Sequence, residues 1–162
     1  MNSNVSNYMS RAYDCLRQAQ ILFDQEEYTG VCNRAYYAYF DTVRALLATL
    51  DIATRSHSAV QNLFSLHFVK TELFDKQDVR ALSKLFDMCQ ESDYDAEPTV
   101  DASDARYAIE VTIEFLLQTE HIYEKVASAR PISHENTCWS GLRRSPARSG
   151  PTVLARWYSD FR

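Results

Sequence analysis

The chain has 162 residues, 46% of them apolar, and a formal net charge of −5 at pH 7. This length suggests one domain with a buried hydrophobic core, and no apolar run approaches the roughly 18 residues that a membrane span requires. The N-terminal stretch MNSNVSNYMS has neither the basic nor the apolar region of a signal peptide. We therefore expect a cytoplasmic protein without a membrane segment.

Charge, glycine and proline divide the chain into two parts. Residues 130–162 hold six arginines against two acidic residues, so this segment is near +4 and the rest of the chain is near −9. The same segment holds three prolines, two glycines and both tryptophans. We predict a helical domain over residues 1–128 and an irregular, disordered basic tail over residues 129–162. Two interpretations of the tail stay open: an RNA contact through arginine and tryptophan, or a low-selection extension from a shifted reading frame.

Cysteine spacing argues against a metal site. The four cysteines are widely separated, and none belongs to a CxxC pair or a Cys–His cluster: Cys15, Cys32, Cys89 and Cys138. Zinc sites need closely spaced thiolates or imidazoles. We therefore predict reduced and mostly buried thiols, and we expect neither a bound metal nor a cofactor.

Apolar residues recur at steps of three and four in the first part of the chain, which predicts a helix over about residues 5–23. The polar stretch DQEEYTG interrupts the pattern before a second helix over about residues 32–50. Adjacent apolar pairs in this second segment exclude the alternation of a strand, so the aromatic stretch NRAYYAYF is predicted to be helical. Tyr36 and Phe40 lie on its apolar seam and are predicted core residues.

Three further helices are predicted. A short one covers about residues 58–69, and the next has a single apolar stripe that consists of Val79, Leu82, Phe86 and Cys89. The acidic stretch ESDYDAEPTVD ends that helix, since Pro98 disfavours helical backbone at the preceding residue. Asp101 and Ser103 are candidate N-caps of the last helix. About five helices with short connections predict an all-α fold, an antiparallel helical bundle.

Polar side chains gather on the second helix opposite its apolar seam. At about 100° per residue, the helix brings together Arg34, Tyr37, Asp41 and Arg44, with Ala38, Ala45 and Ala48 beside them. One interpretation is a solvated face of helical-neighbour pairs. The others are a self-complementary dimer face, where alanines let another helix approach, and a groove in which two arginines bind phosphate.

His57 follows Arg55 and Ser56 at the start of the third predicted helix. It is a candidate hydrogen-bond donor to a phosphate or a candidate acid–base group. The alternative is a structural residue that caps or braces this helix. A small basic cleft formed by Arg34, Arg44, Arg55 and Lys70 is compatible with a short connection between the second and third helices.

Three stretches carry a family resemblance. EEYTGVCNRAYYAYFDTVRALL, RSHSAVQNLFSLHFVKTELF and QESDYD occur in the order seen in the HEPN domain family, and the resemblance covers about residues 8–127. It implies a helical bundle that is commonly a homodimer. Many members act on RNA, several as metal-independent ribonuclease toxins paired with a minimal nucleotidyltransferase, and others bind nucleotides or RNA without cleavage.

The resemblance also implies site residues and two departures from the family pattern. Arg34, Tyr37 and Asp41 match the start of the motif helix. His57 matches the Ser-His turn, and Asp93 with Tyr94 matches the Asp-Tyr motif. The nuclease members carry an arginine and a histidine with four to six residues between them, and no such pair occurs here. Cys89 stands where the pattern has an arginine, and a neutral thiol cannot stabilise charge on a phosphorane-like transition state.

These features favour a non-catalytic module that binds nucleotide or RNA, through Arg34, Tyr37, Asp41, Arg44, Arg55 and His57, in a toxin–antitoxin-type system with a minimal nucleotidyltransferase partner. One alternative is a ribonuclease toxin with a rearranged set, in which His57 is the catalytic acid–base group and Arg34 or Arg44 clamps the phosphate. The other is a purely protein–protein helical module. The acidic body argues against tight, unassisted RNA binding.

Overall fold

The computed structural model describes the backbone of residues 3–94 and 100–129, with side chains over 4–90 and 100–123. Within these ranges the secondary structure is helical and contains no strand, as predicted. The elements are α1 (Ser3–Asp24), α2 (Tyr28–Ala48), α3 (His57–Phe64), the π-helical turn η1 (Ser65–Val69), α4 (Lys76–Tyr94) and α5 (Ala102–Ala129). The predicted tail lies outside the described residues, apart from Ala129 at the end of α5. No helix in the described part of the chain is long and apolar enough to cross a membrane.

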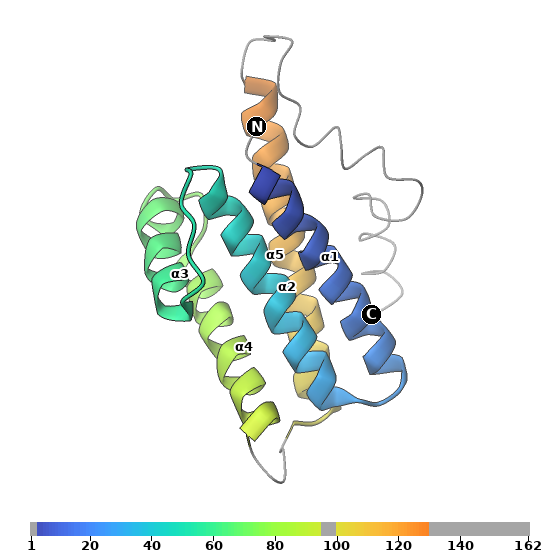
Figure 1. Ribbon diagram of the computed structural model, residues 1–162. Helices are drawn as coiled ribbons and strands as arrows, with labels where there is room; N and C mark the ends of the chain where they lie inside the picture. The colour runs from blue at the N-terminus through green and yellow to red at the C-terminus, as the bar shows by residue number, and fades with distance from the viewer. Residues whose placement is uncertain (1–2, 95–99, 130–162) are drawn as a thin grey trace.

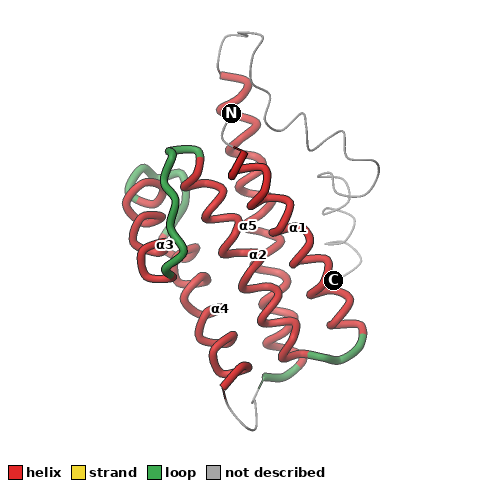
Figure 2. Tube along the Cα trace, in the orientation of Figure 1, coloured by secondary structure: helices red, strands yellow, loops and turns green. Residues whose placement is uncertain are grey.

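The four long helices run alternately up and down and form an antiparallel bundle (Figure 1). α2 is central, because it packs against α1, α4 and α5. α3 and η1 follow α2 in the sequence and precede α4, and they form a short extra layer that packs against the bundle. The loops that join the helices lie at the ends of the bundle or along this layer (Figure 2). The predicted bundle of about five helices is confirmed.

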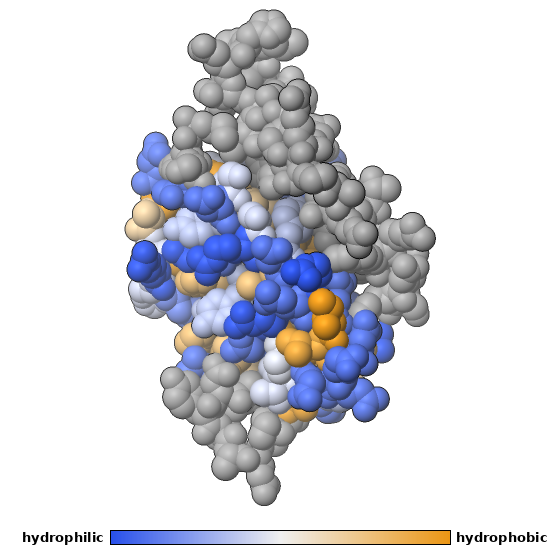
Figure 3. Space-filling view, turned by 45° about the vertical axis from the view of Figure 1, so that its right-hand side comes forward, coloured by the Kyte–Doolittle hydropathy of each residue, from blue (hydrophilic) through white to orange (hydrophobic). Residues whose placement is uncertain are grey.

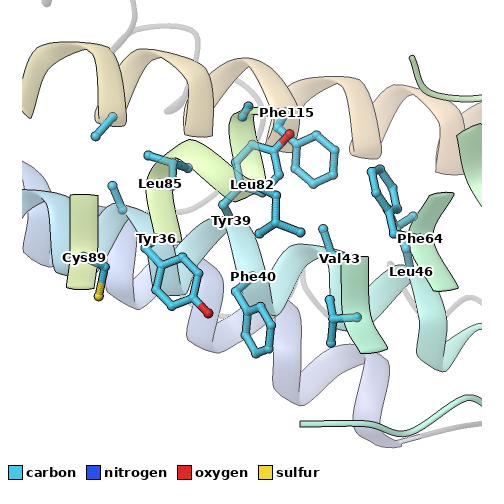
Figure 4. Close-up of a cluster of buried hydrophobic side chains, with 14 of the residues drawn as sticks. Tyr36, Tyr39, Phe40, Val43, Leu46, Phe64, Leu82, Leu85, Cys89 and Phe115 are labelled. Atoms are coloured by element: carbon cyan, nitrogen blue, oxygen red, sulfur yellow. The ribbon is translucent and has the colours of Figure 1, made fainter. Parts of the chain in front are cut away.

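Two groups of apolar side chains fill the bundle on opposite sides of α2. One joins α2 to α3, α4 and α5, and the other joins α2 to α1 and α5. Figure 4 shows the first group, in which the Tyr39 ring stacks on Phe115 with ring centroids 4.0 Å apart. Tyr36 and Phe40 are 5% and 6% exposed, so their assignment to the core is confirmed. Each buried ring contributes roughly 1.5–3 kcal/mol of transfer free energy.

Aspartates at matching positions start two of the helices. The Asp101 carboxylate accepts hydrogen bonds from the backbone N–H groups of Ser103 and Asp104, at 2.7 and 3.1 Å, while Asp104 accepts one in return from the Asp101 N–H. Asp75 and Asp78 make the same reciprocal cap at the start of α4. Asp101 is thus confirmed as an N-cap. Ser103 as a cap is wrong: it lies in the first turn and donates its hydroxyl to Asp101.

The predicted third helix starts one residue early and changes its winding. Its second half is the π-helical turn η1, where the Lys70 N–H donates to the Ser65 carbonyl at 3.0 Å. Phe64 packs edge-on against Phe74 and Phe115, with ring centroids 5.3 and 5.7 Å apart. These aromatic contacts hold the short layer to the bundle.

α1 and α2 approach closely at Gly30. A Cβ atom on Gly30 would lie 3.1 Å from Leu22 Cδ1. We expect Gly30→Ala to be close to neutral, since alanine favours a helix by up to about 1 kcal/mol over glycine and this gain offsets the tight contact. Gly30→Val adds branched carbons at the same contact and should destabilise the fold by about 1–3 kcal/mol. Urea unfolding measures both, and equal stability of the two variants would show that the helices do not meet closely here.

Candidate functional site

The central helix reaches the surface along one short stretch. From Val31 to Ala48 every side chain of α2 is buried except Asn33 and Arg34, which are half-buried, and Tyr37, which is 36% exposed. We call Asn33, Arg34 and Tyr37 the α2 window. Large exposed hydrophobic side chains are few in the described part, and Tyr37 is the aromatic one among them. Figure 3 shows one face of the molecule, which is mostly hydrophilic with a small hydrophobic group.

Arg34 is held on one edge only. Its Nε and Nη2 atoms both donate to Asn33 Oδ1, at 3.1 and 2.5 Å, and its guanidinium carbon lies 5.1 Å from the centroid of the Tyr37 ring. Within the described residues, the outer edge formed by Nη1 and the second Nη2 hydrogen has no hydrogen-bond partner. This is the edge with which an arginine binds a phosphate or carboxylate through two parallel hydrogen bonds.

α1 brings a second arginine to the window. Tyr8 contacts Arg44 and Arg11 contacts Asp41, so α1 runs antiparallel to α2 and Arg11 lies about one helical turn along α2 from Tyr37. Burial raises the pKa of the Cys15 thiol, while the positive charges of Arg34 and Arg11 lower it, so both guanidinium groups share its electrostatic surroundings. The Arg11 side chain is 58% exposed.

Sequence reasoning missed Arg11 because it lies on another helix. Tyr8, Arg11 and Cys15 recur at helical spacing on α1, and an arginine between two residues that pack against the core is the signal in the sequence that points to it.

Asp41 and Arg44 lie under α1 instead of facing solvent. They are 0% and 9% exposed. The Arg44 guanidinium donates to Asp41 Oδ1 at 3.1 Å, to the Tyr8 hydroxyl at 2.8 Å and to the Thr54 carbonyl at 3.1 Å. The solvated-face interpretation is therefore wrong for this pair. The predicted alanines do admit a neighbouring helix, and that helix is α1 of the same chain.

Asp41 carries a second ion pair. Its Oδ2 atom lies 3.2 Å from Arg11 Nη2, without the geometry of a hydrogen bond. Burial raises the pKa of Asp41, and the charges of Arg11 and Arg44 counteract part of this rise. The Asp41 carboxylate thus forms ion pairs with both the exposed Arg11 and the buried Arg44.

Removal of the Asp41 carboxylate should leave the Arg44 charge buried without compensation. We expect Asp41→Ala to lower the free energy of unfolding by about 3 kcal/mol, as measured by urea denaturation. Asp14→Ala is the matched control, because Asp14 is exposed and its pair with Arg17 is 3.9 Å long. Its effect should stay below about 0.5 kcal/mol. Equal effects of the two substitutions would contradict the buried ion pair.

His57 is the first residue of α3 and lies against an aromatic cluster. Its ring stacks on Phe86 with centroids 3.8 Å apart, and its Nδ1 atom lies 3.4 Å from the Tyr36 hydroxyl. Burial lowers the pKa of His57, and the charge of Asp87 opposes this only in part. The ring is thus neutral at neutral pH and braces α3 against α2 and α4. This arrangement supports the structural interpretation, since a neutral imidazole is a poor proton donor.

The remaining predicted residues do not form one cleft. Arg55 and Lys70 are exposed, but they flank opposite ends of the α3–η1 segment, about 20 Å apart at 1.5 Å per helical residue. Because Arg44 is also buried, the predicted basic cleft is wrong.

The side chains of Asp93 and Tyr94 lie outside the described residues. Cys89 is 2% exposed, which confirms its burial. No cluster of three potential metal ligands occurs in the described part of the chain.

The lowered pKa of His57 makes stability depend on pH. The unfolded chain, with a His57 pKa near 6.5, binds more protons than the folded chain once the pH falls toward this value, so acidification favours unfolding. We expect His57→Phe, which keeps the stack on Phe86, to lose less Tm than the wild type between about pH 7.5 and about pH 5.5. His121→Phe, at an exposed position of α5, should behave like the wild type. An unchanged pH dependence in His57→Phe would refute this assignment.

Comparisons with known proteins agree on the family. A family model described as the HEPN domain matches residues 5–122. The Methanocaldococcus jannaschii protein named "Putative toxin MJ0142" is 30% identical over 112 residues, which cover 69% of this chain and 76% of that protein. A UPF0332 protein of Thermotoga maritima is 32% identical over 90 residues, 56% of this chain and 68% of that protein. The chain therefore belongs to the HEPN domain family, as its motifs predict.

Proposed function

We propose that this HEPN domain protein is a nucleotide- or RNA-binding module of a toxin–antitoxin-type system, and that it works without strong catalysis. The observation that carries the proposal is the α2 window, where an exposed tyrosine ring lies beside Arg34 in an otherwise buried helix. The exposed Arg11 of α1 pairs with Asp41, one helical turn along α2 from Tyr37. Two Methanocaldococcus jannaschii relatives carry the name "Putative toxin", which supports the system in which we place the chain.

Arg34 and Tyr37 of the window and Arg11 beside it each have a part in the proposed binding. The outer edge of Arg34 can hold one phosphate with two hydrogen bonds, and the exposed Arg11 supplies a second cation for a neighbouring phosphate. The Tyr37 ring offers a surface on which a base can stack, and such stacking contributes about 1–3 kcal/mol per base. The site is therefore suited to a short single-stranded segment or a nucleotide.

The charge of the chain limits the affinity that we expect. Residues 1–129 are near −9, so the window is a small cationic region on an acidic body. Each phosphate contact with a single strand contributes about −0.7 to the slope of log K against log salt concentration. Two arginines therefore predict weak binding with a shallow slope of about −1.4.

The same geometry accounts for our preference for binding over cleavage. The chain lacks an arginine and histidine at the nuclease spacing, and the neutral His57 ring is stacked within the aromatic cluster. Each of the three guanidinium nitrogens of Arg44, the other proposed phosphate clamp, donates to a partner inside the fold. Substitution of Arg44 would thus test stability more than binding.

A partner protein and self-association belong to the proposal. We expect a homodimer and an association with a minimal nucleotidyltransferase. Native mass spectrometry of the protein purified without denaturation tests both, because a dimer that carries the mass of a second protein, a nucleotide or an RNA fragment identifies the bound class. A bare monomer would favour a plain helical interaction module.

Reversal of the Arg34 charge should weaken RNA binding. We expect Arg34→Glu to lower the affinity for a fluorescent oligouridine of about 12 nucleotides by about tenfold, or ~1.4 kcal/mol, in fluorescence anisotropy at low salt. The salt slope should become shallower by about 0.7 as one phosphate contact is lost.

Arg80→Glu is the matched control, since Arg80 is an exposed residue of α4 and the substitution makes the same change in net charge. We expect an effect of less than about twofold, because salt screens a distant surface charge. If the two variants lose the same affinity, binding follows overall charge and the window is not the site.

A further inference from the structure

Asn33 connects the window arginine to a thiol on another helix. Its Oδ1 atom accepts both hydrogen bonds from Arg34, and its Nδ2 atom donates to Cys89 Sγ at 3.4 Å. Cys89 belongs to α4 and is buried in the core group around α2. Figure 4 shows its sulfur on the same side of this group as the Tyr36 hydroxyl. Three side chains from two helices thus form one continuous hydrogen-bonded chain.

We propose that Asn33 and Cys89 are positioning residues that hold Arg34 with its outer guanidinium edge toward an incoming phosphate. The proposal rests on the function inferred above. It assigns to α4 a direct part in setting the orientation of a binding residue on α2.

The pattern of donors and acceptors determines which end of the Asn33 amide faces Arg34. An asparagine amide can turn over and exchange its oxygen and its nitrogen. If Asn33 turned over, its NH2 group would face the Arg34 guanidinium, and donors would meet donors. The Cys89 sulfur is an acceptor for the NH2 group, so it favours the orientation in which Oδ1 faces Arg34. The Oδ1 atom then occupies Nε and one Nη2 hydrogen, and the outer edge remains available.

The same argument gives a reason for the departure at position 89. The family pattern has an arginine there, and an arginine side chain offers only donors. It would draw the Asn33 oxygen toward α4 and away from Arg34. A thiol at this position therefore leaves the Asn33 oxygen free to accept from Arg34, and Cys89 helps to position the binding residue.

The first measurement needs no ligand. In NMR spectra of the full chain, the Arg34 Nε–H group should be ordered, because it donates to Asn33. We expect Asn33→Ala to make this group mobile, Cys89→Ala to loosen it, and Cys89→Ser, which keeps an acceptor, to restore most of the order. Cys32→Ala is the matched control, since Cys32 is an equally buried thiol of the same core group and should leave Arg34 unchanged.

The second measurement is a double-mutant cycle with the same oligouridine probe. Asn33→Ala should weaken binding by about fivefold, because binding must then immobilise an Arg34 side chain that the wild type already holds in place. In an Arg34→Ala background the same substitution should have almost no effect, because Asn33 acts through Arg34. Additive losses, or an Arg34 Nε–H that stays ordered in both Asn33→Ala and Cys89→Ala, would overturn the positioning role.

The two measurements separate this proposal from the function on which it rests. If the wild type fails to bind the RNA while Asn33→Ala and Cys89→Ala still loosen Arg34, the hydrogen bonds from Arg34 through Asn33 to Cys89 are supported and the RNA-binding function is refuted. If the wild type binds and the cycle shows coupling, both are supported. Binding without coupling keeps the function and removes the positioning role.

Discussion

The buried ion pair between Asp41 and Arg44 is the constraint on which the arrangement of this bundle depends. Two charges in the middle of a central helix are costly to bury unless each polar atom finds a partner. Arg44 finds its partners in α1, in α2 and in the connection between α2 and α3, through Tyr8, Asp41 and Thr54. One guanidinium group thus joins three segments, and the first helix must lie where its tyrosine can reach it.

The window is what this arrangement leaves uncovered. α1 packs over the polar face of α2 and buries Asp41, while small alanines let the two backbones approach. On the other side, α4 covers the apolar seam. Arg34 and Tyr37 lie in the strip between the two neighbours, and Arg11 pairs with Asp41 one helical turn further along α2. The charge at the surface is therefore tied to the charge in the core.

The aromatic cluster around His57 follows from the same packing. α3 is a short helix of 8 residues, and an isolated helix of this length is unstable in water. It is held by its contacts, among them the stack of His57 on Phe86 and the approach of the Tyr36 hydroxyl to the imidazole. A histidine that fastens a helix in this way is poorly suited to move protons for a reaction. The contacts of His57 therefore support a structural role for this residue at the start of α3.

Much of the fold and part of the site could be predicted from the sequence. The helical periods, the aspartate cap at Asp101 and the core positions of Tyr36 and Phe40 are local features, since spacing along one helix decides which side chains share a face. The grouping of Arg34 with Tyr37 is local for the same reason. The Gly- and Pro-poor composition of residues 1–129 likewise favours helices without any knowledge of their packing.

What the sequence determined by itself is therefore the set of helices and the faces of each one. The tertiary structure decided which polar face became interior and which remained exposed, because burial depends on the neighbour that a helix receives. Asp41 and Arg44 have the same helical spacing as a solvated pair, yet α1 covers them. Asn33 and Cys89 came together only when α2 met α4, since a contact between residues 56 positions apart leaves no periodic signal in the chain.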